Sequence, residues 1–141
     1  MENEELIRTA MEARKQAYAP YSKYRVGAAL LTKNGEVIGG CNIENASYGA
    51  TNCAERTAFF KAVSEGKKNF AAIAIIGGDE ETDETAEFAY PCGICRQVMR
   101  EFCDQDTFRV LVAKSETDYE EVFLAQLLPK SFGPEHLSTR E

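Results

Sequence analysis

The sequence predicts an α/β fold in which a mixed β-sheet lies between two layers of helices. Two observations lead to this prediction. A helical pattern near the start is followed by two strands joined by a tight turn, and helices and strands then alternate along the chain. A hairpin makes antiparallel neighbours, whereas right-handed crossovers make parallel ones. The 141 residues contain no repeat or linker that would divide them, so we expect one domain over residues 1–141.

The first part of the chain predicts a helix followed by a hairpin. Apolar residues recur at helical spacing from Leu6 to Tyr18, and Pro20 ends the pattern. Residues 25–32 are apolar enough for a buried strand. Asn34-Gly35 is a strong hairpin-turn signal, and residues 36–38 form the return strand.

Alternating helices and strands are predicted next. Residues 52–66 carry an apolar stripe at helical spacing, with Asn52 as a candidate N-cap and Gly66 as a stop signal. Residues 70–76 form the kind of apolar run that is typical of a fully buried strand. The acidic stretch 79–87 is expected to be a solvated loop.

The last part of the chain predicts two helices and one strand. Pro91 suits the first turn of a helix. The apolar stripe of this helix is expected to consist of Ile94, Val98 and Phe102. Residues 108–112 predict a strand, and a final helix is expected from about residue 120 to residue 128.

Composition limits the classes of function. The net charge of −7 argues against a general affinity for phosphate backbones or anionic membranes, because both depend on clustered Lys and Arg. The start of the chain lacks the basic and apolar pattern of a secretory signal, and no segment approaches the roughly 20 apolar residues of a membrane span, so we expect a cytoplasmic protein. In a reducing compartment, five cysteines favour thiols or metal ligands over disulfides.

Three of these cysteines are placed to bind a metal ion. Cys92 and Cys95 are three residues apart at the start of one predicted helix, and Cys53 opens another. Three thiolates that converge between two helix starts suit zinc and leave its fourth position open for water. Alone, the Cys-x-x-Cys pair also fits a redox motif or half of a structural zinc site.

Glu55, two residues after Cys53, favours catalysis. A carboxylate beside a zinc ligand can take a proton from water and pass it to a substrate, although a lone Glu in a first helical turn also fits a surface residue that complements the helix dipole. Cys-Ala-Glu combined with Pro-Cys-x-x-Cys is the signature of zinc-dependent base deaminases.

Over nearly its whole length the sequence resembles the cytidine deaminase family in its short, homotetrameric form. The matching segments are residues 18–22 (YAPYS), 26–30 (VGAAL), 41–45 (CNIEN), 53–58 (CAERTA), 91–98 (PCGICRQV) and 127–129 (LLP), followed by Phe132. The resemblance implies a three-layer α-β-α fold with a mixed five-stranded sheet and one Zn²⁺ per subunit. It also implies hydrolytic deamination of cytidine and 2′-deoxycytidine to uridine and 2′-deoxyuridine with release of ammonia, as in pyrimidine salvage.

The resemblance assigns roles to individual residues. It makes Cys53, Cys92 and Cys95 the zinc ligands and Glu55 the proton shuttle. Asn42 and Glu44 would hold the ribose hydroxyls, which suits an amide and a carboxylate two residues apart on an extended segment. The remaining expected substrate-binding residues are Ala54, through its backbone, Tyr24, where the family has Phe, and Ala46, Tyr48 and Phe132, which would complete the sites of neighbouring subunits in a homotetramer.

Arg56 has an electrostatic task in this interpretation. Zinc with three thiolates carries a net charge of −1, which weakens its effect on a bound water, and a guanidinium that donates hydrogen bonds to the sulfurs would restore part of that effect. An exposed helix arginine is the plainer alternative. Cys41 and Cys103 are expected to be small core residues, and His136 in the C-terminal tail is not expected to be catalytic.

Three other functions remain open at this stage. A deaminase of a related nucleoside such as blasticidin S would share the metal signature, and so would an editor of bases in polynucleotides. The editor should carry a basic surface, which the net charge of −7 disfavours. A structural zinc module that binds a protein partner would need a fourth protein ligand and no Glu55.

Overall fold

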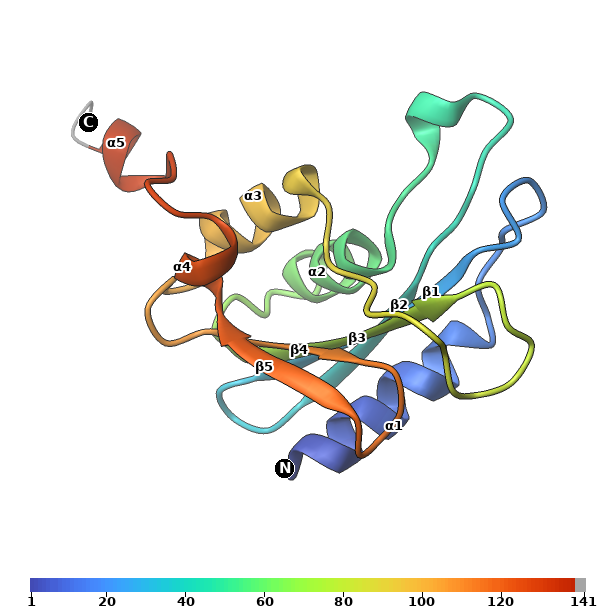
Figure 1. The fold of residues 1–141 in the computed structure, drawn as a ribbon. Helices are drawn as coiled ribbons and strands as arrows, with labels where there is room; N and C mark the ends of the chain where they lie inside the picture. The colour runs from blue at the N-terminus through green and yellow to red at the C-terminus, as the bar shows by residue number, and fades with distance from the viewer. Residues whose placement is uncertain (139–141) are drawn as a thin grey trace.

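The computed structural model describes residues 1–138 and shows a five-stranded sheet between layers of helices (Figure 1). The single domain expected over residues 1–141 includes residues 139–141, which lie outside the described residues. The helices are α1 (Asn3–Arg14), α2 (Ala54–Ser64), α3 (Gly93–Phe102), α4 (Leu124–Leu127) and α5 (Glu135–Ser138), with a 3-10 turn at Tyr48–Ala50. The strands are β1 (Arg25–Thr32), β2 (Val37–Cys41), β3 (Phe70–Gly78), β4 (Arg109–Ala113) and β5 (Tyr119–Phe123).

The sheet is mixed, as predicted. Its strand order is β2-β1-β3-β4-β5, with β3 and β4 parallel and every other neighbouring pair antiparallel. The parallel pair is joined by the crossover that contains α3, and β1 and β2 form the predicted hairpin. Helix α1 covers one face of the sheet, and α2 and α3 lie on the other (Figure 1).

Alternation along the strands divides the core between the two faces. On β1, Leu30 belongs to the cluster packed under α2 and α3, whereas Ala29 belongs to the cluster under α1. The first cluster is built around Phe59, which is fully buried and contacts the rings of Phe70 and Phe108. A filled core on both faces therefore gives α2 and α3 a rigid base.

Close packing sets the position of the start of α2. A Cβ atom on Gly40 of β2 would lie 2.5 Å from the backbone oxygen of Ala54 and 2.6 Å from the backbone nitrogen of Ala58. Only a residue without a side chain allows this approach. The first turn of α2, which contains Glu55, is thus seated directly on the sheet.

The helix expected over residues 120–128 was wrong. Residues Tyr119–Phe123 instead form the edge strand β5, antiparallel to β4, and only Leu124–Leu127 are helical. Apolar residues in this window fit a helical spacing, but tertiary packing overrides that local pattern. Val122 packs on one core cluster and Tyr119 on the other, which the alternation of a strand permits. This segment supplies the fifth strand.

Two details of the helices also differ from prediction. Asn52 does not cap α2: the N-cap is Cys53, and the Asn52 side chain donates to Thr57 Oγ1 at 3.2 Å. The predicted stripe of α3 was wrong at Ile94, which is 62% exposed. The buried residues are Cys95, Met99 and Arg100; the apolar ones lie one position further along than predicted, because the helix turns Cys95 toward the start of α2. Within residues 1–138, no helix is long and apolar enough to span a membrane.

Candidate metal centre

Three cysteines meet where α2 and α3 begin. Cys53 is the N-cap residue of α2, Cys92 is the N-cap residue of α3, and Cys95 lies in the first turn of α3. Their Sγ atoms all lie within 4.8 Å of one another. Free backbone N–H groups at both helix starts favour thiolates at this point.

The cluster fits a tetrahedral zinc ion. Zn–S bonds of about 2.3 Å at tetrahedral angles place sulfur atoms about 3.8 Å apart. The Sγ atoms of Cys53 and Cys92 are 3.9 Å apart, and those of Cys92 and Cys95 are 3.5 Å apart. Among residues 1–138 the group consists of three side chains, so a zinc ion held by them would keep a fourth coordination position for a small molecule, as in catalytic rather than structural zinc sites.

The charges around the cluster stabilise thiolate at Cys53. Hydrogen bonding from Cys95 lowers the pKa of Cys53 to about 5, and Arg56 contributes to this shift. Arg56 Nη2 donates to Cys53 Sγ at 3.2 Å, and the same bond raises the pKa of the guanidinium. Arg56 therefore faces the cluster and offsets its negative charge.

Glu55 lies beside the cluster in the first turn of α2 and is 5% exposed. Burial raises the pKa of the Glu55 carboxyl to about 7, and the neighbouring Cys53 adds to the increase. A carboxyl group with a pKa near neutrality can both accept and return a proton at physiological pH. Its burial excludes the surface role that a lone glutamate in a first turn often has.

A cavity of about 350 Å³ opens onto these residues. This volume lies within the range of small-molecule sites. Of the residues predicted from the sequence, its walls include Tyr24, Asn42, Cys53, Ala54, Glu55 and Cys92. The fold therefore brings two of the three expected ligands, the acid–base group and part of the expected substrate-binding set to one hollow, and the third ligand, Cys95, is buried next to them.

The segment from Asn42 to Glu44 is held in an extended form. Ile43 pairs with Tyr18 on one side and with Asn52 on the other. The Asn42 amide accepts from the Val26 backbone N–H at 2.9 Å and donates to the Tyr24 carbonyl at 2.8 Å. These contacts fix the orientation of the Asn42 amide at the cavity wall.

Glu44 faces an adjoining hollow rather than the cavity itself. It accepts hydrogen bonds from the backbone N–H groups of Tyr21 and Ser22 and from the Ser22 hydroxyl, and these bonds lower the pKa of its carboxyl. Tyr48 lines the same hollow, and Thr51 lines both hollows. The two hollows are therefore adjacent.

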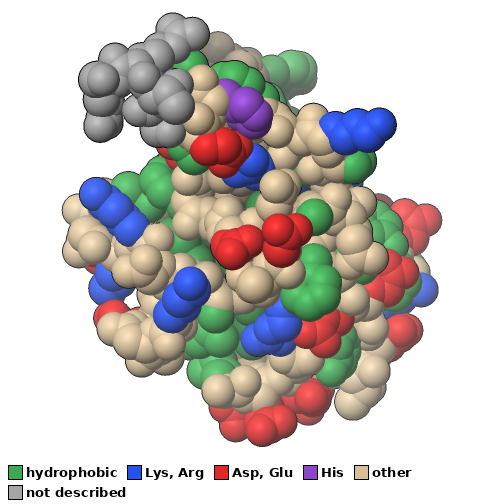
Figure 2. Space-filling view, turned by 90° about the vertical axis from the view of Figure 1, so that its left-hand side faces the viewer, with side chains coloured by type: hydrophobic (Ala, Val, Ile, Leu, Met, Phe, Trp, Pro, Cys, Tyr) green, Lys and Arg blue, Asp and Glu red, His purple; other side chains and the backbone are tan. Residues whose placement is uncertain are grey.

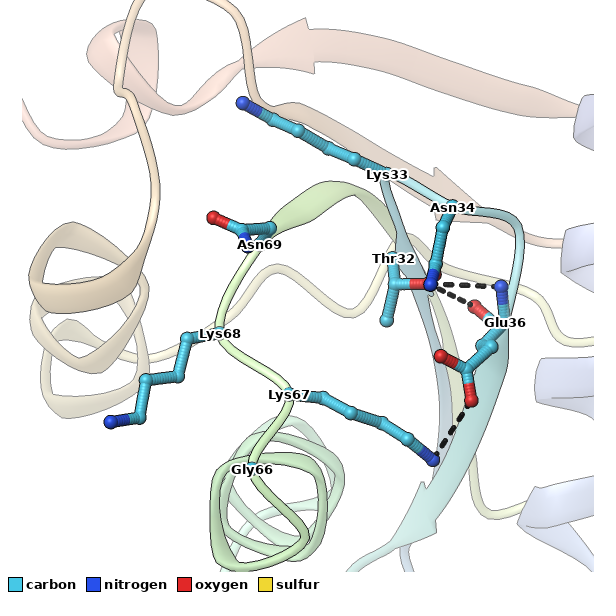
Figure 3. A pocket seen from close by; sticks show the side chains of 8 residues that line it. All are labelled: Thr32, Lys33, Asn34, Glu36, Gly66, Lys67, Lys68 and Asn69. Atoms are coloured by element: carbon cyan, nitrogen blue, oxygen red, sulfur yellow. Dashed lines mark hydrogen bonds and ion pairs between the residues drawn. The ribbon is translucent and has the colours of Figure 1, made fainter.

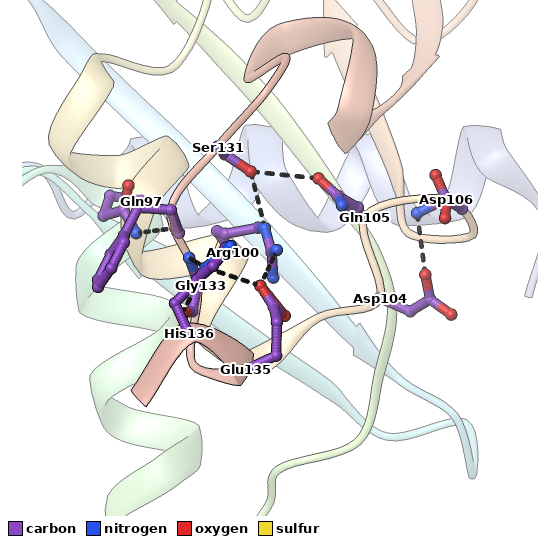
Figure 4. Close-up of polar contacts among 10 residues, drawn as sticks. Gln97, Arg100, Asp104, Gln105, Asp106, Ser131, Gly133, Glu135 and His136 are labelled. Carbon is purple, nitrogen blue, oxygen red and sulfur yellow. Dashed lines mark hydrogen bonds and ion pairs between the residues drawn. The ribbon is translucent and has the colours of Figure 1, made fainter. Parts of the chain in front are cut away.

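Two of the predicted substrate-binding residues, Ala46 and Phe132, line neither of these hollows in the single chain. Ala46 is exposed, and Phe132 is 57% exposed and stacks on His136. The C-terminal segment that carries Phe132 is anchored on α3, where Gln97 donates to the Phe132 carbonyl at 2.8 Å and Arg100 binds Ser131 and Glu135 (Figure 4). The backbone around Phe132 is thus fixed while its ring points outward.

Sequence reasoning missed one wall of the cavity. Phe88, Ala89 and Tyr90 form this part of its lining. They precede Pro91 and Cys92 directly, so their continuity with the metal-binding turn was the available signal. The acidic stretch before them had been interpreted only as a solvated loop, and most of its residues are indeed exposed.

Another hollow, of about 520 Å³, lies at the opposite end of α2 (Figure 3). Lys67 on its wall is ion-paired with Glu36 at 3.1 Å. None of the predicted site residues lines this hollow. The two remaining cysteines also stand outside the metal cluster. Cys103 is buried, as expected, and Cys41 is half-buried. The chemistry is concentrated at the starts of α2 and α3.

Comparison with known proteins agrees with this geometry. The profile of the cytidine and deoxycytidylate deaminase zinc-binding region matches residues 1–111. The chain belongs to this deaminase family. It is 49% identical to the cytidine deaminase of Halalkalibacterium halodurans, over 98% of this chain and 99% of that protein. The crystal structure of cytidine deaminase from Burkholderia pseudomallei superposes with a TM-score of 0.84 at 47% identity, covering 94% of this chain and 100% of the other.

A deaminase of different specificity is a more distant relative. Blasticidin-S deaminase of Bacillus cereus is 36% identical over 70% of this chain and 71% of its own. The deaminase family therefore includes proteins named for different nucleosides, and the side chains around the cavity must distinguish them.

Proposed function

We propose that this chain is a zinc-dependent hydrolase that converts cytidine and 2′-deoxycytidine to uridine and 2′-deoxyuridine and releases ammonia. The observation that carries the proposal is the buried Glu55 carboxyl beside three converging thiol groups, with Glu55, Cys53 and Cys92 lining a cavity of nucleoside size. The cytidine deaminases similar to this chain over nearly its full length support the choice of substrate.

The proposed mechanism assigns Cys53, Cys92 and Cys95 as the zinc ligands. Zinc, when bound there, supplies Lewis acidity that brings the pKa of a water molecule close to neutrality. Glu55 would accept a proton from the attacking water and deliver it to N3 of the pyrimidine as the C4–O bond forms. Glu55 would then take the proton of the new C4 hydroxyl and pass it to the amine, so that the C4–N bond breaks, ammonia leaves and C4 becomes a carbonyl; one carboxyl thus acts first as base and then as acid.

Substrate positioning falls to the residues around the cavity. The backbone of Ala54 is proposed to hydrogen-bond the pyrimidine, and the Tyr24 ring to pack against it. Asn42 and Glu44 are proposed to hold the ribose hydroxyls. The Asn42 amide and the Glu44 carboxylate keep unused donor or acceptor capacity beyond the bonds described above, which this role requires.

The experiment measures zinc per chain and the loss of ultraviolet absorbance of cytidine in the same sample. The proposal predicts about one zinc per chain and conversion of cytidine, with slower conversion of blasticidin S and none of cytosine in single-stranded DNA. Zinc binding without conversion of cytidine would refute it. Conversion of blasticidin S in preference to cytidine would refute the substrate assignment.

The alternatives find less support. A polynucleotide editor needs a continuous basic surface, whereas on the face shown in Figure 2 the described Lys and Arg side chains are scattered among acidic ones. A structural zinc module has no need of a buried carboxyl group whose pKa is raised to about 7 beside its ligands.

Arg56 is proposed to tune the metal centre through its contact with Cys53. Replacing Arg56 with Gln leaves the negative charge of three thiolates uncompensated, so we expect kcat for cytidine to fall by about tenfold to a hundredfold, the usual effect of removing a partner of a metal ligand. Steady-state kinetics with a zinc assay checks this. The exposed Arg8 gives a matched control, and equal activities of the Arg8→Gln and Arg56→Gln proteins would contradict the role.

We also propose that the active enzyme is a homotetramer whose sites are completed by neighbouring subunits. The outward rings of Tyr48, 78% exposed, and Phe132 support this, because large exposed apolar groups often mark an interface. Light scattering of the active protein is expected to give about four times the chain mass. A fully active monomer would contradict the proposal.

The setting of the reaction is proposed on chemical grounds. Three cysteines needed as thiolate ligands favour a reducing compartment, which supports a cytoplasmic location. Deamination of cytidine to uridine is a step of pyrimidine salvage, and we assign the chain to this pathway. We further propose that residues 1–141 act as one deaminase domain.

A further inference from the structure

The side chain of Arg14, at the end of α1, binds the segment that follows β3. Arg14 is 5% exposed, and its guanidinium donates to three carbonyls at the end of β3 and just beyond it, those of Gly78, Glu80 and Thr82, each at 2.8 Å. Its Nε donates to the Arg25 carbonyl on β1 at 2.9 Å. Four backbone acceptors from two regions of the chain thus converge on one buried cation, and charge-assisted bonds of this kind are strong.

The approach of α1 to the sheet makes this arrangement possible. A Cβ atom on Gly27 of β1 would lie 2.1 Å from the Ala10 carbonyl and 2.5 Å from the backbone nitrogen of Arg14. A residue with a side chain at this position would push the end of α1 away from the sheet. Gly27 therefore keeps Arg14 within reach of the carbonyls beyond β3.

Further contacts hold the same segment along its length. The Thr85 backbone N–H donates to the Lys114 carbonyl at 2.9 Å, and the Lys114 ammonium lies 4.5 Å from the centre of the Phe88 ring. The Tyr90 hydroxyl donates to Glu120 on β5 at 2.5 Å. Residues 79–90 are therefore tied to α1, to Lys114 directly after β4, and to β5, although the side chains of the acidic stretch 79–87 are mostly exposed.

This segment ends in the cavity. Phe88, Ala89 and Tyr90 form one wall, and Cys92 follows two residues later. The position of this wall depends on the path that the chain takes as it leaves β3. The carbonyls that Arg14 binds, those of Gly78, Glu80 and Thr82, lie at the start of that path. Arg14 does not itself line the cavity.

We propose that Arg14 is a positioning residue for the nucleoside site, which fixes segment 79–90 as a permanent wall and so places Phe88 and Tyr90 against the bound substrate. This inference rests on the proposed function for its substrate. It gives the acidic stretch 79–87 a structural purpose, because this stretch connects β3 to the aromatic wall of the cavity and is held in place rather than moving as a lid. The wall contacts ground state and transition state alike, so its displacement raises KM more than it lowers kcat.

The test compares Arg14→Lys and Arg14→Met with Arg109→Lys in the zinc-loaded full-length protein. Arg109 also joins distant elements, since it binds Asn3 of α1 and Glu121 of β5, but it does not touch segment 79–90. We expect Arg14→Lys to keep about one zinc per chain, to raise KM for cytidine about tenfold and to change kcat less than about threefold. Hydrogen–deuterium exchange of residues 79–90 should accelerate in Arg14→Lys and not in Arg109→Lys. Arg14→Met should show larger effects, and if it does not fold, Arg14→Lys carries the test.

Several outcomes would overturn the proposal. A lower melting temperature of Arg14→Lys with KM and exchange in segment 79–90 unchanged would show a purely structural role. Loss of zinc from Arg14→Lys would show that Arg14 acts through the metal ligands. If the unsubstituted protein itself leaves cytidine unchanged, the proposed function fails, and the exchange measurement still decides separately whether Arg14 holds the segment.

Discussion

Replacing Glu55 with Gln is expected to abolish turnover while leaving the metal centre intact. The amide fills the same buried space at the start of α2 but cannot accept and return a proton. General acid–base catalysis contributes roughly a hundredfold to ten-thousandfold, and Glu55 is proposed to act in both proton transfers. We therefore expect kcat for cytidine to fall by about a thousandfold or more, with about one zinc per chain retained.

Metal analysis and steady-state kinetics on one preparation check this prediction. Glu65→Gln is a matched control, because Glu65 lies at the other end of α2, where its side chain pairs with Lys67. The control should keep full activity. Near-normal turnover by the Glu55→Gln protein would remove Glu55 from the mechanism.

Cys92→Ala is expected to remove the metal ion and with it the activity. Cys92 begins α3 and lies 3.9 Å from Cys53 and 3.5 Å from Cys95. Without it two sulfurs remain, which is too few to hold zinc in an open catalytic site. Zinc binding energy also stabilises the folded state, so the melting temperature should fall together with the zinc content.

Cys41 offers the comparison for this substitution. It is a half-buried free thiol outside the metal cluster. The Cys41→Ala protein should therefore retain its zinc and its turnover, and its melting temperature should stay close to that of the unsubstituted protein. Atomic absorption, an activity assay and thermal unfolding measure the three properties. A Cys92→Ala protein with one zinc per chain would contradict the assignment of the ligands.

The parts of the fold that could be predicted from the sequence are those with strong local signals. The strand over residues 25–32 and the helix closed near Gly66 follow from hydrophobic patterning and turn residues. Edge strand β5 could not be recognised in this way, because Glu120 and Glu121 interrupt its apolar pattern and only the open edge of β4 makes it a strand. Its identity depends on tertiary contacts.

The residues of the site also divide into those with a local sequence signal and those brought together by tertiary contacts. The ligand cluster could be anticipated because Cys53, Cys92 and Cys95 all lie at helix starts, where spacing along the chain determines direction in space. The charge argument that predicted a guanidinium beside the sulfurs is consistent with the bond from Arg56 to Cys53. The bonds from Arg14 to the Thr82 and Gly78 carbonyls join residues more than sixty positions apart, and no local pattern reports such pairing.

A crystal structure of the zinc-loaded protein with a hydrated pyrimidinone riboside tests the central claim most directly, because this ligand resembles the tetrahedral intermediate of the proposed reaction. We expect Glu55 within about 2.6–3.2 Å of N3 and of the hydroxyl on C4, with Asn42 and Glu44 on the ribose and Phe88 and Tyr90 against the ligand. A riboside bound elsewhere, or a Glu55 carboxylate turned away from the ring, would contradict it.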